Sequence, residues 1–125
     1  MNASESISEA ESAVLAVLWE KGTATAENVV AALAKQRDWQ ESTVKTLLGR
    51  LLKKGAVRAE KDGRRFIYSP ILARDEWLSH ESESLLNRLY GGRLAPLVAH
   101  FSRHRKLSKR DVGELKRLIA GLEDE

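Results

Sequence analysis

The sequence predicts a mainly α-helical protein with one small β-hairpin, organised as two domains over residues 1–72 and 73–125. Apolar residues recur at steps of three and four through most of the chain, which is the period of a helix buried along one face. The segment 57–69 instead mixes β-branched, aromatic and charged residues around an Asp-Gly pair, which is typical of a hairpin. Beyond residue 73 the strand signals disappear and three amphipathic segments follow.

The composition indicates a folded protein without cysteine chemistry. The 125 residues are 42% apolar and include no cysteine, which excludes disulfides and thiolate metal sites. No signal peptide or membrane-spanning stretch is visible, so we expect a cytoplasmic protein without membrane insertion. Because no glycine-rich phosphate loop or nucleophilic constellation is present either, we expect no enzyme and assign no catalytic residue.

The positive charge is concentrated in the middle of the chain. Residues 1–38 carry three basic and six acidic residues, and residues 39–70 carry eight basic and three acidic ones. The rest carries ten basic and nine acidic residues, and the whole chain is net +3. Such a local excess indicates a phosphate-bearing partner docked against the central stretch.

Two helices are expected before the basic stretch. Ser8 and Glu11 have the spacing of a capping box, and Gly22 is the expected stop of the helix that they begin. Thr25 is the expected cap of a second helix, which runs from Ala26 to about residue 36.

A third helix within residues 40–55 carries two incompatible faces. Its apolar face must be buried and consists of Val44, Leu47, Leu48, Leu51 and Leu52. Its opposite face is cationic and hydroxylic and carries Ser42, Lys45, Thr46, Gly49, Arg50 and Lys53. The glycine on this face would let a bulky partner approach closely. Two helices joined by about four residues, the second of them basic, predict a helix-turn-helix whose second helix enters the major groove of DNA.

The predicted hairpin lies directly after this helix. We expect strands over residues 57–61 and 64–69, joined by a two-residue turn at Asp62 and Gly63. The basic tip, residues 61–65, would touch the backbone phosphates beside the occupied groove. The first domain is therefore expected to be a winged helix-turn-helix.

The second domain is expected to form three helices that need a partner. About 55 residues can scarcely bury enough of their own apolar surface to be stable alone, so we expect a two-fold homodimer. The expected dimerisation residues are Leu78, Leu85, Leu89, Leu97, Phe101, Val112, Leu115, Ile119 and Leu122.

Aromatic residues and histidines leave some alternatives open. Trp19 and Trp39 are expected to close the core of the first domain, although the Trp39 indole could instead donate to a phosphate. His100 and His104 have the spacing of a two-histidine metal site, but no third ligand is identified. We therefore expect no metal and no cofactor.

Several short runs resemble one known family. They are Glu11, Leu18-Trp19, Asp38-Trp39, the run 43–55 (TVKTLLGRLLKKG), Gly63-Arg64, Tyr68-Ser69-Pro70, Gly91-Gly92 and His100-Phe101. Together they resemble the penicillinase repressor family, which includes the BlaI, MecI and CopY repressors. The likeness extends over most of the chain, from about residue 7 to residue 122.

The resemblance implies a DNA-binding transcriptional repressor that binds an inverted-repeat operator as a homodimer. The regulated genes would serve β-lactam resistance or a related stress response. The residues implied to contact DNA are Ser42, Thr43, Lys45, Thr46, Arg50, Lys53, Arg64 and Arg65.

Within this set, the resemblance places Thr43, Lys45 and Thr46 at base edges. It assigns Ser42, Arg50 and either Arg64 or Arg65 of the wing to phosphates. The chemistry agrees, because a lysine can donate to guanine and a threonine methyl can pack on the methyl group of thymine. Relatives often begin this helix with Ser-Pro, which this chain lacks. Its cap is therefore left open between Asp38 and Ser42.

The resemblance also implies two modes of release from DNA. The copper-sensing branch uses C-terminal cysteines, which this chain lacks. The β-lactam branch is cleaved at an Asn-Phe bond by a membrane sensor protease, and the corresponding residues here are His100 and Phe101. These two residues are thus a candidate cleavage site. The alternative to a DNA-binding repressor is a winged-helix module that binds another protein and no DNA.

Overall fold

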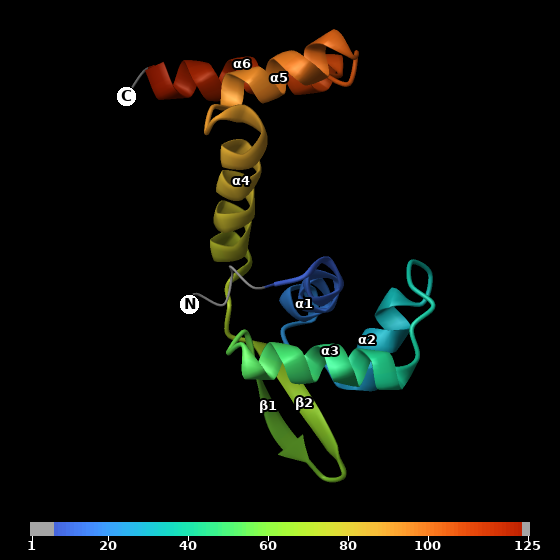
Figure 1. Ribbon diagram of the computed structural model, residues 1–125. Helices are drawn as coiled ribbons and strands as arrows, with labels where there is room; N and C mark the ends of the chain where they lie inside the picture. The colour runs from blue at the N-terminus through green and yellow to red at the C-terminus, as the bar shows by residue number, and fades with distance from the viewer. Residues whose placement is uncertain (1–6, 124–125) are drawn as a thin grey trace. The chain divides into compact units, whose positions relative to one another are not determined.

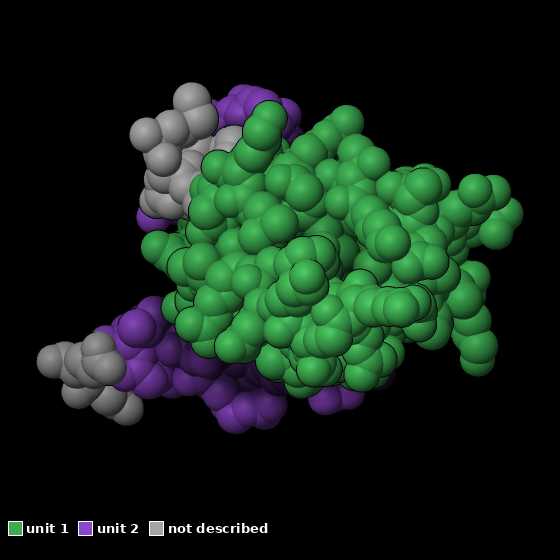
Figure 2. Space-filling view, turned by 90° about the horizontal axis from the view of Figure 1, so that it is seen from below, with its two compact units in different colours: residues 1–81 green, residues 82–125 purple. Residues whose placement is uncertain are grey.

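The computed structural model describes residues 7–123 and divides into two compact units, residues 1–81 and 82–125, which Figure 2 shows in different colours. The division falls within a helix, α4 (Arg74–Tyr90). The boundary between a DNA-binding and a dimerisation domain, expected after residue 72, therefore stays a prediction.

The elements follow the predicted order (Figure 1). They are α1 (Glu9–Lys21), α2 (Ala26–Leu33), α3 (Glu41–Lys53), β1 (Val57–Asp62), β2 (Arg65–Pro70), α4 (Arg74–Tyr90), α5 (Leu94–Arg103) and α6 (Lys109–Glu123). The expected fold class, mainly helical with a hairpin wing, is confirmed. None of these helices is long and apolar enough to cross a membrane.

The first two helices begin as predicted. Ser8 accepts a hydrogen bond from the Glu11 amide, and the Glu11 side chain accepts one from the Ser8 amide. Gly22 ends α1 with φ at 84°, a conformation that favours glycine. Thr25 caps α2, with Asn28 completing its capping box. Helix α2 stops at residue 33 rather than near residue 36, where the amides of Ala34 and Gln36 donate to carbonyls three residues back instead of four.

Helix α3 corrects two expectations. Its cap position is Gln40, which makes no side-chain capping bond, so neither Asp38 nor Ser42 caps the helix. The buried stripe comprises only the first four of the five expected residues, because Leu52 is 39% exposed. Leu52 lies in the last turn, at the edge of the apolar stripe, where the core no longer covers it.

The hairpin is formed one residue later than expected. Asp62 pairs with Arg65, so the two loop residues are Gly63 and Arg64 rather than Asp62 and Gly63. Gly63 has φ at 67°, and a glycine in the first loop position is the pattern of a type II′ turn. Because the turn is shifted, Arg64 lies at the tip itself.

A short backbone bridge joins the wing to the helices. The amide of Ala24 donates to the carbonyl of Tyr68 at 3.0 Å, and the Tyr68 amide donates to the Ala24 carbonyl at 2.8 Å. The segment between α1 and α2 therefore extends the two-stranded sheet at β2. This bridge fixes the hairpin against the helix-turn-helix.

The core of the first unit is formed by α1, α2, α3 and the base of the wing. Trp19 is partly buried against it, as expected, and its indole donates to the Leu72 carbonyl at 2.9 Å. The Trp19 ring also lies 5.6 Å from that of Trp77, which anchors the start of α4 within this unit. Trp39 is likewise partly buried against the core.

One charged residue is buried with the apolar ones. Glu11 is 1% exposed, and its carboxylate lies 2.6 Å from the ammonium of Lys54, just after α3. Burial opposes the charge, but hydrogen bonds from Lys54 and Ser8 outweigh it and hold the pKa of Glu11 below its ordinary value. This ion pair connects the first turn of α1 to the end of α3.

The second unit contains helices without a core of their own. Among its described residues none is fully buried. Helix α6 begins with a cap in which the Asp111 amide donates to the Ser108 hydroxyl at 3.0 Å and the Ser108 amide donates to the Asp111 carboxylate at 3.3 Å. The apolar side chains of α5 and α6 instead line an open groove of about 590 Å³.

Replacing Glu11 by glutamine should destabilise the first unit in a pH-dependent way. At pH 7 the loss should be about 1–3 kcal/mol, since a charged hydrogen-bonded pair is replaced by a neutral group. Because the pKa of Glu11 is lowered on folding, the carboxylate contributes fully above its unfolded pKa. That contribution is lost as the pH falls through the lowered value.

Urea unfolding of wild type and Glu11→Gln at a series of pH values measures this difference. The matched control is Glu9→Gln, which changes the same charge at a side chain that is 76% exposed and should have a much smaller effect. A Glu11→Gln difference that stays constant from neutral to strongly acidic pH would contradict the assignment.

Candidate nucleic-acid interface

The candidate interface is the outer face of α3 together with the tip of the wing. Helix α3 buries Val44, Leu47, Leu48 and Leu51, each at most 5% exposed. Because these four side chains are fixed in the core, the opposite side of the helix must face outward. Figure 1 shows α3 beside the hairpin, which follows it directly in the chain.

All eight residues predicted to bind DNA are exposed. Six of them lie on α3 and two at the wing, namely Ser42, Thr43, Lys45, Thr46, Arg50, Lys53, Arg64 and Arg65. The structure brings three of these, Lys45, Arg64 and Arg65, to the lining of one hollow of about 380 Å³. The other five belong to α3 outside that hollow.

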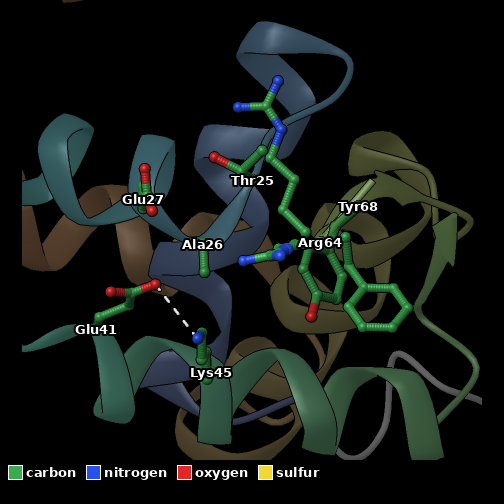
Figure 3. A pocket seen from close by; sticks show the side chains of 9 residues that line it. Thr25, Ala26, Glu27, Glu41, Lys45, Arg64 and Tyr68 are labelled. Atoms are coloured by element: carbon green, nitrogen blue, oxygen red, sulfur yellow. Dashed lines mark ion pairs between the residues drawn. The ribbon is translucent and has the colours of Figure 1, made fainter. Parts of the chain in front are cut away.

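The hollow lies between α3, the start of α2 and the wing (Figure 3). Lys45 reaches into it from α3 and Arg64 from the wing tip, and Thr25 and Ala26 line it at the start of α2. A helix N-terminus carries partial positive charge, which adds to the charges of the lysine and arginine. Glu27 and Glu41 also line the hollow, so its three cations exceed its carboxylates by one. The wing arginines at its rim could hold a DNA phosphate while Lys45 stays available for a base.

Glu41 is a neighbour of Lys45 that the sequence analysis did not assign to the interface. Its carboxylate lies 3.3 Å from the Lys45 ammonium, one turn away on α3 (Figure 3). Both side chains are well exposed, so the pair contributes little and Lys45 can exchange Glu41 for another acceptor. The sequence already contains the signal for this pair, because an acid four residues before a lysine lies next to it on a helix.

Two further contacts organise the rest of the face. The hydroxyl of Thr46 donates to the Ser42 carbonyl at 3.0 Å, so this hydroxyl is satisfied within the helix. Ahead of α3, Arg37 lies 4.8 Å above the ring of Trp39 and pairs with Glu9 at the start of α1. The segment leading into α3 is thereby held against α1.

The histidine pair remains without further ligands. The rings of His100 and His104 lie 4.5 Å apart on α5 and just after it. Between residues 7 and 123, no three histidine or acidic side chains gather in a way that could hold a metal ion.

Comparison with known proteins agrees with this geometry. A family model described as penicillinase repressor matches residues 7–121. The chain belongs to the penicillinase repressor family. The penicillinase repressor of Bacillus licheniformis is 35% identical over 113 residues, which cover 90% of this chain and 88% of the relative. The methicillin resistance regulatory protein MecI of Mammaliicoccus sciuri is 32% identical over 118 residues, covering 94% and 96%.

The similarity extends to the three-dimensional fold of a solved relative. The DNA-binding domain of the repressor BlaI is 36% identical to this penicillinase repressor family member, with a TM-score of 0.53. The match covers 61% of this chain and 93% of that domain. The family consists of transcriptional repressors rather than enzymes.

Proposed function

We propose that this protein represses transcription by binding an inverted-repeat DNA operator as a homodimer, with α3 of each copy in a major groove. The observation that carries the proposal is the sidedness of α3, whose buried leucine stripe turns a basic and hydroxylic face outward. Membership of the penicillinase repressor family supports the same function. The apolar groove of α5 and α6 would also suit a protein-binding module, but the basic face of α3 favours DNA.

Three residues of this face are proposed to read bases. Lys45 would donate to guanine, and Thr43 and Thr46 would pack their methyl groups against thymine. The inward hydrogen bond of the Thr46 hydroxyl supports this role, because its methyl group is then the part left for a partner. Residues near the start of a recognition helix are the ones that usually reach base edges.

The remaining residues are proposed to hold phosphates. Ser42, Arg50 and Lys53 would contact the backbone from α3, and Arg64 and Arg65 would do so from the wing. Such contacts fix the register of the protein on DNA without reading its sequence. Their affinity should depend strongly on salt.

The second unit is proposed to form the dimer interface. Leu118 is 66% exposed, Ile119 53% and Leu122 68%, and all three line the apolar groove of α5 and α6. Apolar surface of this extent usually marks a protein interface. A second copy that supplies the same side chains would cover the groove, at about 25 cal/mol per Å² of apolar area buried.

The relatives indicate the process under control. The names of the penicillinase repressor and of the methicillin resistance regulator point to β-lactam resistance. We propose that repression ends when a membrane sensor protease cleaves between His100 and Phe101. Both residues are exposed on α5, which supports access to this bond.

Lys45→Ala and Arg64→Ala should weaken DNA binding in different ways. Loss of a base contact at Lys45 should cost about 1–3 kcal/mol on the preferred operator and flatten the base preference at one position. Loss of a phosphate contact at Arg64 should weaken all duplexes alike and reduce the salt slope by about one. Both effects can be measured by fluorescence anisotropy on duplexes selected by the wild type from a random pool.

Wild-type affinity should fall by roughly three to five decades between 50 and 200 mM salt if about 6–10 phosphates are contacted. A salt-insensitive complex, or two variants with the same pattern of loss, would refute the assignment of these residues.

Ile119→Glu should convert the dimer to a monomer. A charge placed in an apolar interface without a partner is strongly unfavourable, so the mass in solution should fall toward the 14.0 kDa of one chain. Sedimentation equilibrium at micromolar concentration measures this. Lys116→Glu, on an exposed polar position of the same helix, is the matched control and should stay dimeric. If the wild-type protein itself has the mass of a monomer, the proposed dimer is wrong.

Cleavage can be tested in cells that also express a membrane sensor protease of the β-lactam branch. Exposure to a β-lactam should produce a fragment that ends at His100, detectable by mass spectrometry. His100→Asn restores the asparagine of the β-lactam branch, so it should be cleaved at least as fast. An intact chain after full induction, in both proteins, would rule this mode of release out.

A further inference from the structure

Gly49 lies in the middle of the outer face of α3. Together with Ser42, Thr46 and Lys53 it follows steps of four, three and four, and all four positions are exposed. They form one row opposite the buried stripe. A glycine at the centre of this row leaves the helix backbone uncovered.

The fold of the protein itself does not require this glycine. Gly49 is not among the residues with positive φ, so no turn demands it. Apart from its chain neighbours and the backbone of its own helix, a Cβ atom at this position would meet no atom within 4 Å, so no packing contact of the described chain demands the glycine. Glycine is also the poorest residue for a helix interior after proline. The chain therefore carries an unfavourable residue where alanine would fit.

The surroundings of Gly49 give this position a distinct shape. Thr46, one turn before, keeps its hydroxyl against its own helix, so its profile is low. Lys45 and Arg50 lie on either side of the row and carry the positive charges. Gly49 therefore leaves the helix backbone uncovered between the side chains of Thr46 and Lys53, with a cation on either side of the row. This suits the close approach of a negatively charged partner.

We infer that Gly49 is a positioning residue for the operator: its missing side chain lets the floor of the major groove come into contact with the backbone of α3. This inference rests on the proposed function and adds a requirement to it. The depth at which α3 enters the groove decides whether the side chains of Lys45 and Thr46 reach base edges. A side chain at position 49 would hold the whole helix away from them.

Two variants of increasing size, Gly49→Ala and Gly49→Leu, test the inference. Alanine and leucine are both strong helix formers, so both variants should melt a few degrees higher than wild type. Operator affinity should nevertheless fall, by at least about fivefold for alanine and further for leucine, because overpacked interfaces are costly. Affinity for a random duplex should change much less, since non-specific binding depends on phosphates.

The duplex used should be the one that the wild type selects from a random pool, at fixed salt. Ala32→Leu is the matched control, because it adds an exposed leucine to α2 at a position that does not line the hollow. It should leave operator affinity unchanged. A merely structural role for Gly49 would lower the melting temperature, which the inference does not allow.

Three results would overturn the inference or its basis. Operator affinities of both variants within twofold of wild type would show that nothing approaches Gly49 closely. A lower melting temperature of Gly49→Ala would show that the fold itself needs the glycine. If the wild type selects no duplex at all, the proposed function fails, and the inference fails with it.

Discussion

The structure of the first unit depends on the burial of one apolar stripe of α3. Four of its side chains lie in a core shared with α1, α2 and the base of the wing, and this fixes the rotation of α3 about its own axis. Every exposed feature of the interface follows from that rotation. The bridge between Ala24 and Tyr68 then sets the position of the wing beside α3. A core that accepted α3 in another orientation would place its lysine and threonines elsewhere.

Two ion pairs of the first unit, like its buried stripe, lie away from the outer face of α3. The acidic residues near the N-terminus act from behind the basic stretch, where Glu11 binds Lys54 and Glu9 binds Arg37. These two pairs hold the end of α3 and the segment that leads into it. The cations on the outer face are paired at most with exposed neighbours such as Glu41. Acidic charge therefore stabilises the scaffold without neutralising the surface that would meet phosphate.

Most of this fold was predictable from the sequence, because its signals are local. The spacing of apolar residues predicted the helices, and the positions of Ser8 and Thr25 just before them predicted the caps. The hairpin turn was displaced by one residue, since Gly63 can occupy either loop position and only the strand pairing decides between them. Contacts between distant segments could not be read in this way. The partner of Glu11 lies 43 residues further along the chain, and nothing in either local sequence connects the two.

The apolar side chains of α5 and α6 are exposed in the single chain, and the proposed dimer would cover them. Such a dimer would also give the repressor a part that can be removed to switch it off. Two linked recognition helices bind far more tightly than one, by a factor of about 10² to 10⁴, because the second contact is intramolecular. Breaking the chain within α5 would separate α6 from the rest and remove much of the surface proposed to join the two copies. The recognition helix would remain intact after such a cut, yet operator affinity would fall by roughly the same factor. Loss of the linkage alone would then be enough to release the DNA.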